Sequence, residues 1–229
     1  RGQARVYLDT VNPTKAQHLL QEALKLSDGQ ADRATRARLL ELMAENQLNL
    51  GRPDEAETLR NKARALREEG PGEAELKIRV LLRTGQLNRA RGLLEERLED
   101  EALKPVLRPR AHRETLLILS LIMAFQGDGE EAYACAVRGT SRGRDLGSPY
   151  VTAVGYMREG HAWLLRESVM AYEQACQNYQ KAIGMGNSLA VPRLKVEAFW
   201  GLCRAHGFAG ELAAAEEAAQ RGIAIAERA

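Results

Sequence analysis

Apolar residues recur along this chain at the spacing of helix faces. In residues 39–50, LLELMAENQLNL, and 93–98, LLEERL, the apolar positions fall three or four residues apart. Alternating runs of Val, Ile and Thr, which mark strands, are nearly absent. Proline and glycine divide the pattern into segments of roughly 12–18 residues. The pattern therefore predicts an all-α chain.

One sequence motif recurs along the chain. Residues 46–66 align with residues 79–98 at an offset of 34, and further copies follow at 124–139, 170–183 and 207–228. The copies share a turn glycine and, five residues later, a small alanine: Gly51 and Ala56, Gly85 and Ala90, Gly127 and Ala132, Gly210 and Ala215. The copy at 170–183 keeps Ala175, Tyr179 and Ala182 but lacks the turn glycine.

This recurring motif resembles the tetratricopeptide repeat, whose period is 34 residues. The resemblance covers nearly the whole chain. The resemblance implies a right-handed α-solenoid of antiparallel helix pairs, about eleven helices in all, with a concave side and a convex side. We expect one domain over 1–229, with a half-repeat in 1–30 and five repeats near 32–68, 72–102, 110–146, 150–186 and 191–229. Extra length in 99–114 and 140–150 predicts long linking segments.

Each shared position has a physical reason. Glycine allows backbone angles in the turn that other residues resist. The alanine lets the second helix of a pair approach the first, and a large apolar residue such as Leu94 or Tyr179 fills the gap between repeats. We therefore expect these positions to be structural.

Two segments resemble a more specific class of proteins than the repeat family as a whole. Residues 145–165, with the phrase LGSPY, and 191–228, with RGIAIAER, are similar to the sensor solenoid of large bacterial transcription regulators. These are LuxR-type, maltose-regulon-activator-like signal-transduction ATPases, or relatives with a bacterial transcriptional activation domain. The resemblance implies uptake of a small-molecule inducer or an inhibitory protein, and partner ATPase and DNA-binding modules in a larger parent protein. The chain itself carries no G-x-x-x-x-G-K-[ST] phosphate loop.

Composition excludes several classes of protein. Lys and Arg total 33 and Asp and Glu total 31, a balance that argues against direct binding of nucleic acid. Three cysteines make neither a disulfide framework nor a zinc site, so we expect a cytoplasmic protein without metal or cofactor. The apolar run 115–125 is too short to span a membrane and is expected to be buried.

The aromatic residues point to a binding surface. All of them except Tyr7 lie in the second half of the chain. Phasing on the turn glycines assigns the concave face, which becomes apolar and aromatic toward the C-terminus, as ligand sites usually are. The candidate groove residues are Arg79, Arg83, Phe125, Met157, Arg158, His161, Trp200, Arg204 and Phe208. The alternative is that they pack against the next repeat or a neighbouring domain.

Other clusters favour structural explanations. Arg33, Arg36, Arg38, Arg60, Arg64 and Arg67 lie among glutamates, which predicts solvated helix faces with i,i+4 ion pairs rather than a nucleic-acid contact. Arg138, Arg142 and Arg144 flank a predicted loop with little acid nearby, which could attract an anion or be plain surface. Cys176 and Cys203 fit as small buried side chains. His206 fits a packing position, and a Cys203–His206 nucleophile would lack an oxyanion site.

The sequence thus predicts a non-enzymatic interaction module. The leading hypothesis is the ligand-sensing and protein-interaction region of a bacterial transcription regulator, with an inducer or partner in the groove. The alternative is a general scaffold that binds a peptide or protein and has no link to transcription. Homo-oligomerisation stays open.

Overall fold

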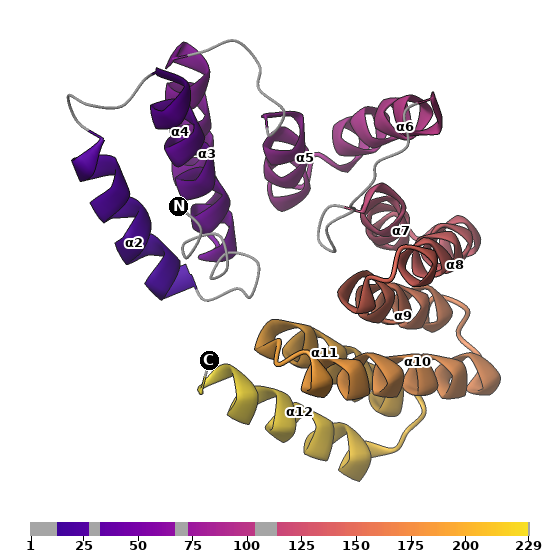
Figure 1. Ribbon diagram of the computed structural model, residues 1–229. Helices are drawn as coiled ribbons and strands as arrows, with labels where there is room; N and C mark the ends of the chain where they lie inside the picture. Colours follow the sequence, from indigo (N-terminus) through magenta and orange to yellow (C-terminus); the bar gives the residue numbers. More distant parts are fainter. Residues whose placement is uncertain (1–12, 28–32, 67–72, 104–113, 229) are drawn as a thin grey trace. The chain divides into compact units, whose positions relative to one another are not determined.

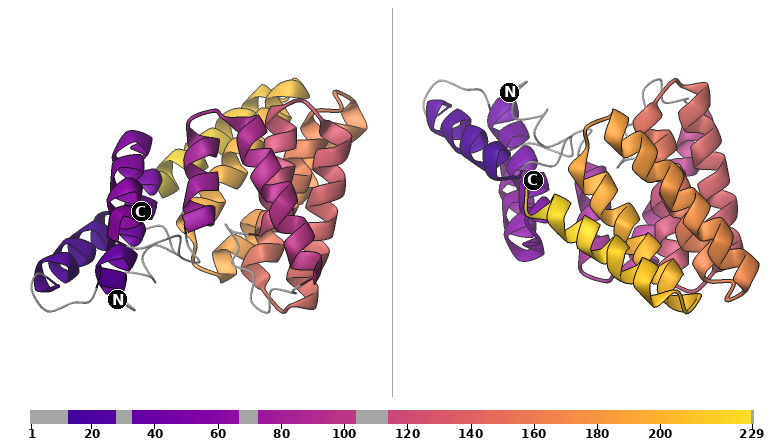
Figure 2. Two further views of the ribbon diagram at one scale, coloured as in Figure 1. Left: turned by 90° about the horizontal axis from the view of Figure 1, so that it is seen from above. Right: turned by 90° about the horizontal axis from the view of Figure 1, so that it is seen from below.

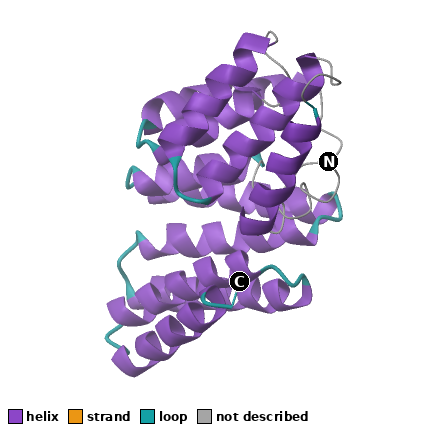
Figure 3. Ribbon diagram, turned by 90° about the vertical axis from the view of Figure 1, so that its left-hand side faces the viewer, coloured by secondary structure: helices purple, strands orange, loops and turns teal. Residues whose placement is uncertain are grey.

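The computed structural model describes residues 13–27, 33–66, 73–103 and 114–228. Those ranges contain eleven helices and no strand (Figures 1 and 3). The helices are α2 (Pro13–Leu26), α3 (Arg33–Asn49), α4 (Pro53–Leu66), α5 (Glu73–Arg83), α6 (Leu87–Leu103), α7 (Thr115–Phe125), α8 (Gly129–Asp145), α9 (Pro149–Leu164), α10 (Val169–Ser188), α11 (Pro192–Phe208) and α12 (Leu212–Ala226).

After the single helix α2, the helices follow one another in the order of five pairs, as the repeat pattern predicts. Direct packing within a pair joins α3 to α4, α7 to α8, α9 to α10 and α11 to α12. One expectation is wrong. Residues 140–150 are not a long linking segment, because α8 continues to Asp145 and α9 begins at Pro149. The extra residues lengthen α8 to 17 residues, against 14 in α4. Most of the other predicted linker, 104–113, lies outside the described residues.

The turn inside a pair is closed by one recurring hydrogen-bond motif. Gly51, Gly85, Gly127 and Gly210 have positive φ values of 76°, 73°, 83° and 78°. In each turn the next residue donates its backbone N–H to the carbonyl five residues earlier, which is the Schellman cap. These bonds join Arg52 to Gln47, Gln86 to Leu81, Asp128 to Met123 and Glu211 to His206. Glycine is favoured here because an L side chain is strained at positive φ.

The turn between α9 and α10 has no glycine. Glu167 takes the left-handed conformation there, with φ of 47°. Ser168 then caps α10, because its Oγ accepts the backbone N–H of Ala171 at 3.2 Å. In this turn a glutamate therefore takes the strained backbone conformation that glycine takes in the other turns.

The chain divides into two compact units, residues 1–93 and 94–229, and each is described by itself. A single domain over 1–229 stays a prediction. In the first unit, α3 packs against α2, α4 and α5, and α4 also contacts α5. Its small core residues include Ala16, Ala44 and Ala56, and Leu20 and Leu48 fill the spaces between helices.

In the second unit each helix from α7 to α12 packs on its neighbour in the sequence (Figure 2). The first helices of successive pairs also touch, α7 with α9 and α9 with α11, so these three share a layer. The α7 helix is buried over most of its length, as its apolar composition predicts. In the described ranges, no helix is long and apolar enough to cross a bilayer.

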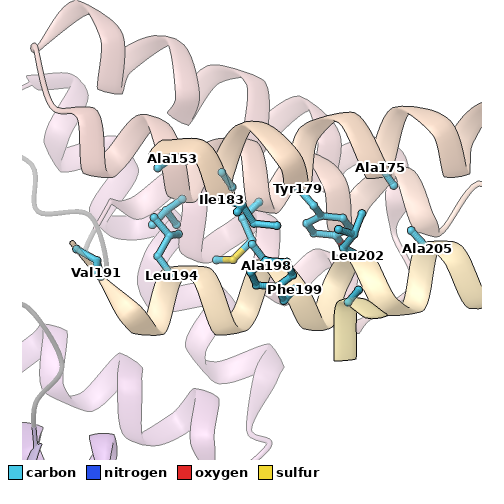
Figure 4. Packing of buried hydrophobic residues seen from close by; sticks show 14 of the residues in the cluster. Ala153, Ala175, Tyr179, Ile183, Val191, Leu194, Ala198, Phe199, Leu202 and Ala205 are labelled. Atoms are coloured by element: carbon cyan, nitrogen blue, oxygen red, sulfur yellow. The ribbon is translucent and has the colours of Figure 1, made fainter. Parts of the chain in front are cut away.

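Small residues bring the helices of the second unit together. Ala132, Ala175 and Ala182 have no exposed surface, and Ala215 is also buried. In the first unit, Ala90 is buried in the same way. Ala175 and Ala182 belong to the large core of the second unit, and Figure 4 shows members of this core between α10 and α11. Tyr179, on α10, is the largest side chain buried there.

Candidate binding site

The candidate site lies on the second unit, where α9, α10 and α11 pack against one another. Arg158 and His161 come from α9, one helical turn apart, and Tyr179 comes from α10. Trp200, Arg204 and Phe208 follow at four-residue spacing on α11, so they share one face of that helix. We call Arg158, His161 and Tyr179 the donor cluster.

Tyr179 is held between two glycines. Its side chain has no exposed surface. A Cβ atom on Gly160 would lie 2.8 Å from Cε1 of the ring, and one on Gly201 would overlap the ring. The ring therefore lies against the backbones of both α9 and α11, which only glycine permits. The repeat pattern predicts that Tyr179 fills the gap between repeats, and its complete burial agrees with this prediction.

The Tyr179 hydroxyl has no hydrogen-bond partner among the described residues. Burial raises the pKa of Tyr179 far above its usual value, although the positive charges of Arg204 and Arg158 act in the opposite direction. The phenol is therefore neutral, and its O–H is a buried donor. The sequence gives no signal for this, because a buried tyrosine usually finds a partner.

His161 contacts residues from all three helices. Its ring centroid lies 5.6 Å from that of Tyr179 and 6.1 Å from that of Trp200, edge-on to the indole. Arg158 Nη1 lies 3.2 Å from His161 Nδ1. The pKa of His161 is well below its ordinary 6.5, because burial disfavours the charged ring and the charges of Arg158 and Arg204 add to this.

These contacts assign the tautomer of His161. A guanidinium can only donate, so Nδ1 must be the acceptor of the Arg158 bond. The neutral ring then carries its proton on Nε2. That Nε2 atom is buried without a partner among the described residues, as is Nε of Arg158. The donor cluster therefore has three buried donors that lack an acceptor.

The donor cluster and its surroundings carry positive charge. Among the described residues, neither Arg158 nor Arg204 forms an ion pair. Burial lowers the pKa of Arg158, and Glu197 partly offsets this. Glu197 itself accepts a hydrogen bond from Arg193 at 2.8 Å. The Arg204 guanidinium lies over Trp200, 4.8 Å from its centroid, and over Phe208 at 5.6 Å.

The aromatic part of the site reaches the surface. Trp200 is 53% exposed and Phe208 is 55% exposed. Tyr172 of α10 packs on Phe208 with ring centroids 5.9 Å apart. Phe125 is also exposed, at the end of α7 in the same layer. The exposed part of the site therefore consists of apolar rings, and His161 of the donor cluster lies next to one of them, Trp200.

The expectation for Met157 needs correction. Met157 is 1% exposed and belongs to the hydrophobic core of the second unit, so it offers no surface to a ligand. Phasing on the turn glycines placed it on the inner face. The helix at this position is surrounded by packed neighbours, and the alternative of packing against adjacent helices holds for this residue.

Arg79 and Arg83 belong to the first unit. Arg79 lies 3.0 Å from a carboxylate oxygen of Glu45 and donates to Asn49 Oδ1 at 2.9 Å. These contacts join α5 to α3 and give Arg79 a role inside this unit. Arg83 is exposed in the last turn of α5. A binding role for either residue stays a proposal.

The expectation that Arg142 flanks a loop with little acid nearby is wrong. Arg138, Arg142 and Arg144 lie in the last two turns of α8. Arg142 Nη1 lies 2.9 Å from Glu101 and 3.1 Å from Glu114, acids distant in sequence. Burial raises the pKa of Glu114, and Arg142 counters this. Arg142 is therefore a partner for buried carboxylates rather than a free anion site.

The remaining clusters have mostly local roles. Arg60 donates to Glu57 at 2.6 Å and Arg38 to Glu41 at 2.6 Å, but these ion pairs are spaced i,i+3 rather than the expected i,i+4. Arg60 and Glu41 are also buried, so the expectation of solvated helix faces is wrong for these two residues. Arg67 lies outside the described residues. Cys176 and Cys203 pack against the core of the second unit. In the part of the chain that the structure describes, no group of His, Cys, Asp or Glu has the arrangement of a metal site.

Comparisons with known proteins concern the repeats and the fold. A family model described as tetratricopeptide repeat matches residues 37–62, across α3 and α4, and 196–221, across α11 and α12. No curated protein sequence matches the chain. The crystal structure of BtubC (BKLC) from P. vanneervenii is similar, with a TM-score of 0.60 and 16% identity, over 96% of this chain and 90% of that chain. At this identity the similarity shows the fold alone, an all-α helical repeat.

Proposed function

We propose that this chain is an interaction module that binds a partner protein, peptide or small molecule on the face formed by α9 and α11. Helical repeats of this type characteristically present extended binding surfaces. The observation that carries the proposal is the donor cluster, whose donors are buried without an acceptor and whose His161 ring contacts exposed Trp200. Buried polar groups that lack partners, beside exposed aromatics, are typical of a site completed by a ligand.

The test compares two double variants in a capture experiment. Trp200→Ala with Arg204→Ala removes the exposed ring and its cation. The control, Arg221→Ala with Ile223→Ala, removes a cation and an exposed apolar side chain from α12 of the same unit. Each immobilised protein is incubated with an extract of the source cells, and helix content is compared by circular dichroism.

We expect the Trp200/Arg204 variant to lose a specific partner that the wild type and the control both retain, with helix content unchanged. Identical capture by all three proteins would contradict a protein or peptide partner on this face. A small-molecule ligand is tested separately, because it should raise the unfolding temperature of the wild type by linkage and not that of the Trp200/Arg204 variant.

A narrower hypothesis is that the chain is the sensor region of a bacterial transcription regulator. It rests on the resemblance of residues 145–165 and 191–228 to such sensors, and these segments contain α9 and α11. On this hypothesis the protein acts in the cytoplasm, and ligand binding biases neighbouring ATPase and DNA-binding modules. Sequencing the parent reading frame tests it: a phosphate loop and a DNA-binding module are expected, and a frame holding only further repeats would favour the general scaffold.

A further inference from the structure

We propose that the donor cluster, with Arg204 beside it, binds an anionic oxygen group, and that the ligand carries an apolar group next to this anion. The proposal rests on the proposed function and concerns the same face. It assigns the chemistry that a partner must present there: a carboxylate or phosphate at the buried end, and an apolar group at the exposed end.

The first argument is that the missing partner is an acceptor. Nε–H of Arg158 and the Tyr179 hydroxyl are donors, and the tautomer assigned above makes Nε2–H of His161 a third. A buried donor without an acceptor costs free energy in the free protein. Ligand oxygens that accept from one or more of these groups recover part of that free energy on binding. A ligand that offers only donors would not.

The second argument is that charge selects an anion over a neutral acceptor. Arg158 and Arg204 both lower the pKa of His161 and both act on Tyr179, so two positive charges lie close to the same two groups. The nearby acid, Glu197, is held by Arg193. Charge-assisted hydrogen bonds are roughly twice as strong as neutral ones, so an anion gains more than a carbonyl at this position.

The third argument concerns the rest of the ligand. Trp200 and Phe208 are half exposed, and Arg204 stacks over both rings. An apolar group next to the anion would cover these rings and reduce the water around the guanidinium, which strengthens the ionic contact. The site therefore favours an amphipathic ligand over a small inorganic anion.

The test uses three small probes that share a phenyl ring. Phenylacetate supplies a carboxylate, phenyl phosphate supplies a phosphate, and phenylacetamide is the neutral, nearly isosteric control. Trp200 fluorescence is recorded in the Trp163→Phe variant, which leaves Trp200 as the one tryptophan of the chain. Ionic strength is held constant with sodium chloride so that general screening does not differ between the probes.

We expect saturable binding of at least one anionic probe and at least tenfold weaker binding of phenylacetamide. Whichever anion binds more tightly identifies the natural group as carboxylate or phosphate. Tyr179→Phe and Arg204→Gln should each weaken the preferred probe on the order of tenfold, which is the size of one hydrogen bond to a charged group. The matched controls Tyr133→Phe and Arg221→Gln should leave its affinity unchanged.

Equal affinity for all three probes, no saturable binding, or unchanged affinity in Tyr179→Phe would overturn the proposal. Tyr179→Phe keeps the ring between the two glycines, so loss of folding does not confuse this result. The two proposals fail in different ways. Partner capture that depends on Trp200 but not on the Tyr179 hydroxyl overturns only the anion site. Probe binding without any Trp200-dependent protein supports the anion site and contradicts only a protein or peptide as the partner in the proposed function.

Discussion

Arg158 donates from Nη1 to Nδ1 of His161 across 3.2 Å, one helical turn along α9. This contact fixes the histidine as a neutral ring with its proton on Nε2, because the guanidinium can only donate. It also keeps a positive charge against the ring, which makes protonation of His161 unfavourable. The contact between Arg158 and His161 thus determines which nitrogen of the His161 ring is a donor in the candidate site.

The stability of the second unit should depend on pH through His161. Its pKa is lowered in the folded state, so below pH 6.5 the unfolded chain binds more protons than the folded chain. The stabilisation is fully present above the unfolded pKa of about 6.5 and is lost as pH falls below it, by up to about 1.4 kcal/mol for each pH unit. The groups that face the ring are Arg158 on α9, Tyr179 on α10 and Arg204 on α11.

Urea unfolding at pH 7.5 and pH 5.5, followed by tryptophan fluorescence, measures this slope. Both tryptophans lie in the second unit, so the signal reports on that unit. His161→Phe keeps an aromatic ring and should reduce the pH dependence. His18→Gln, on the exposed face of α2, should leave it as in the wild type. An unchanged slope in His161→Phe would mean that other groups cause the pH dependence.

Glycine should stabilise the turn between α9 and α10. Glu167 has φ of 47°, a conformation that costs an L residue about 1–2 kcal/mol, so Glu167→Gly is expected to gain about 0.5–1 kcal/mol after its added chain entropy is subtracted. Gly127→Ala should lose a similar net amount, about 0.5–1 kcal/mol, for the same reason in reverse. Nothing lies within 4 Å of its Cβ position, so no steric clash adds to this loss. Chemical denaturation measures both. Gln177→Gly, exposed on α10, is the control and should be destabilising.

The glycines on either side of Tyr179 should not tolerate alanine. Gly160→Ala and Gly201→Ala would each place a methyl group into the tyrosine ring, and overpacking of this kind costs about 1–3 kcal/mol. Gly184→Ala, on the exposed side of α10, meets no atom within 4 Å and should instead stabilise by about 0.5–1 kcal/mol. Equal effects at all three positions in thermal unfolding would show that the cause is helix propensity and not the contact with the ring.

Removal of Arg142 should lower the free energy of unfolding, because Glu114 is buried and Arg142 is its partner. Glu114 is 2% exposed, and its pKa is raised by burial despite Arg142. Arg142→Gln is expected to destabilise by about 2 kcal/mol at pH 7.5, because it leaves a buried carboxylate with less compensation. The loss should shrink at pH 5.5, since a carboxyl with a raised pKa takes up a proton more readily in the folded state. Arg144→Gln, on the same helix, should show a small effect independent of pH.

The repeat pattern anticipated much of the fold and part of the site. Turn glycines such as Gly51 and Gly85 are recognisable in sequence because a local backbone conformation requires them. The sequence predicts the wrong environment for Met157 and Arg142 for a different reason. Helical phasing gives the direction of a side chain but not what packs against it, so Met157 was assigned to a surface. The acids that neutralise Arg142 lie 41 and 28 residues away, beyond any local pattern.

The sequence alone determined that the chain forms antiparallel helix pairs, because period, turn glycines and small residues all act over a few neighbouring residues. It also indicated that a binding face, if present, would lie among the aromatics of the second half. Only the tertiary structure supplies the observations behind the proposed ligand chemistry. The unpartnered hydroxyl of Tyr179 and the tautomer of His161 depend on how α9, α10 and α11 come together. Burial and missing acceptors are properties of packing, which no segment of the chain encodes by itself.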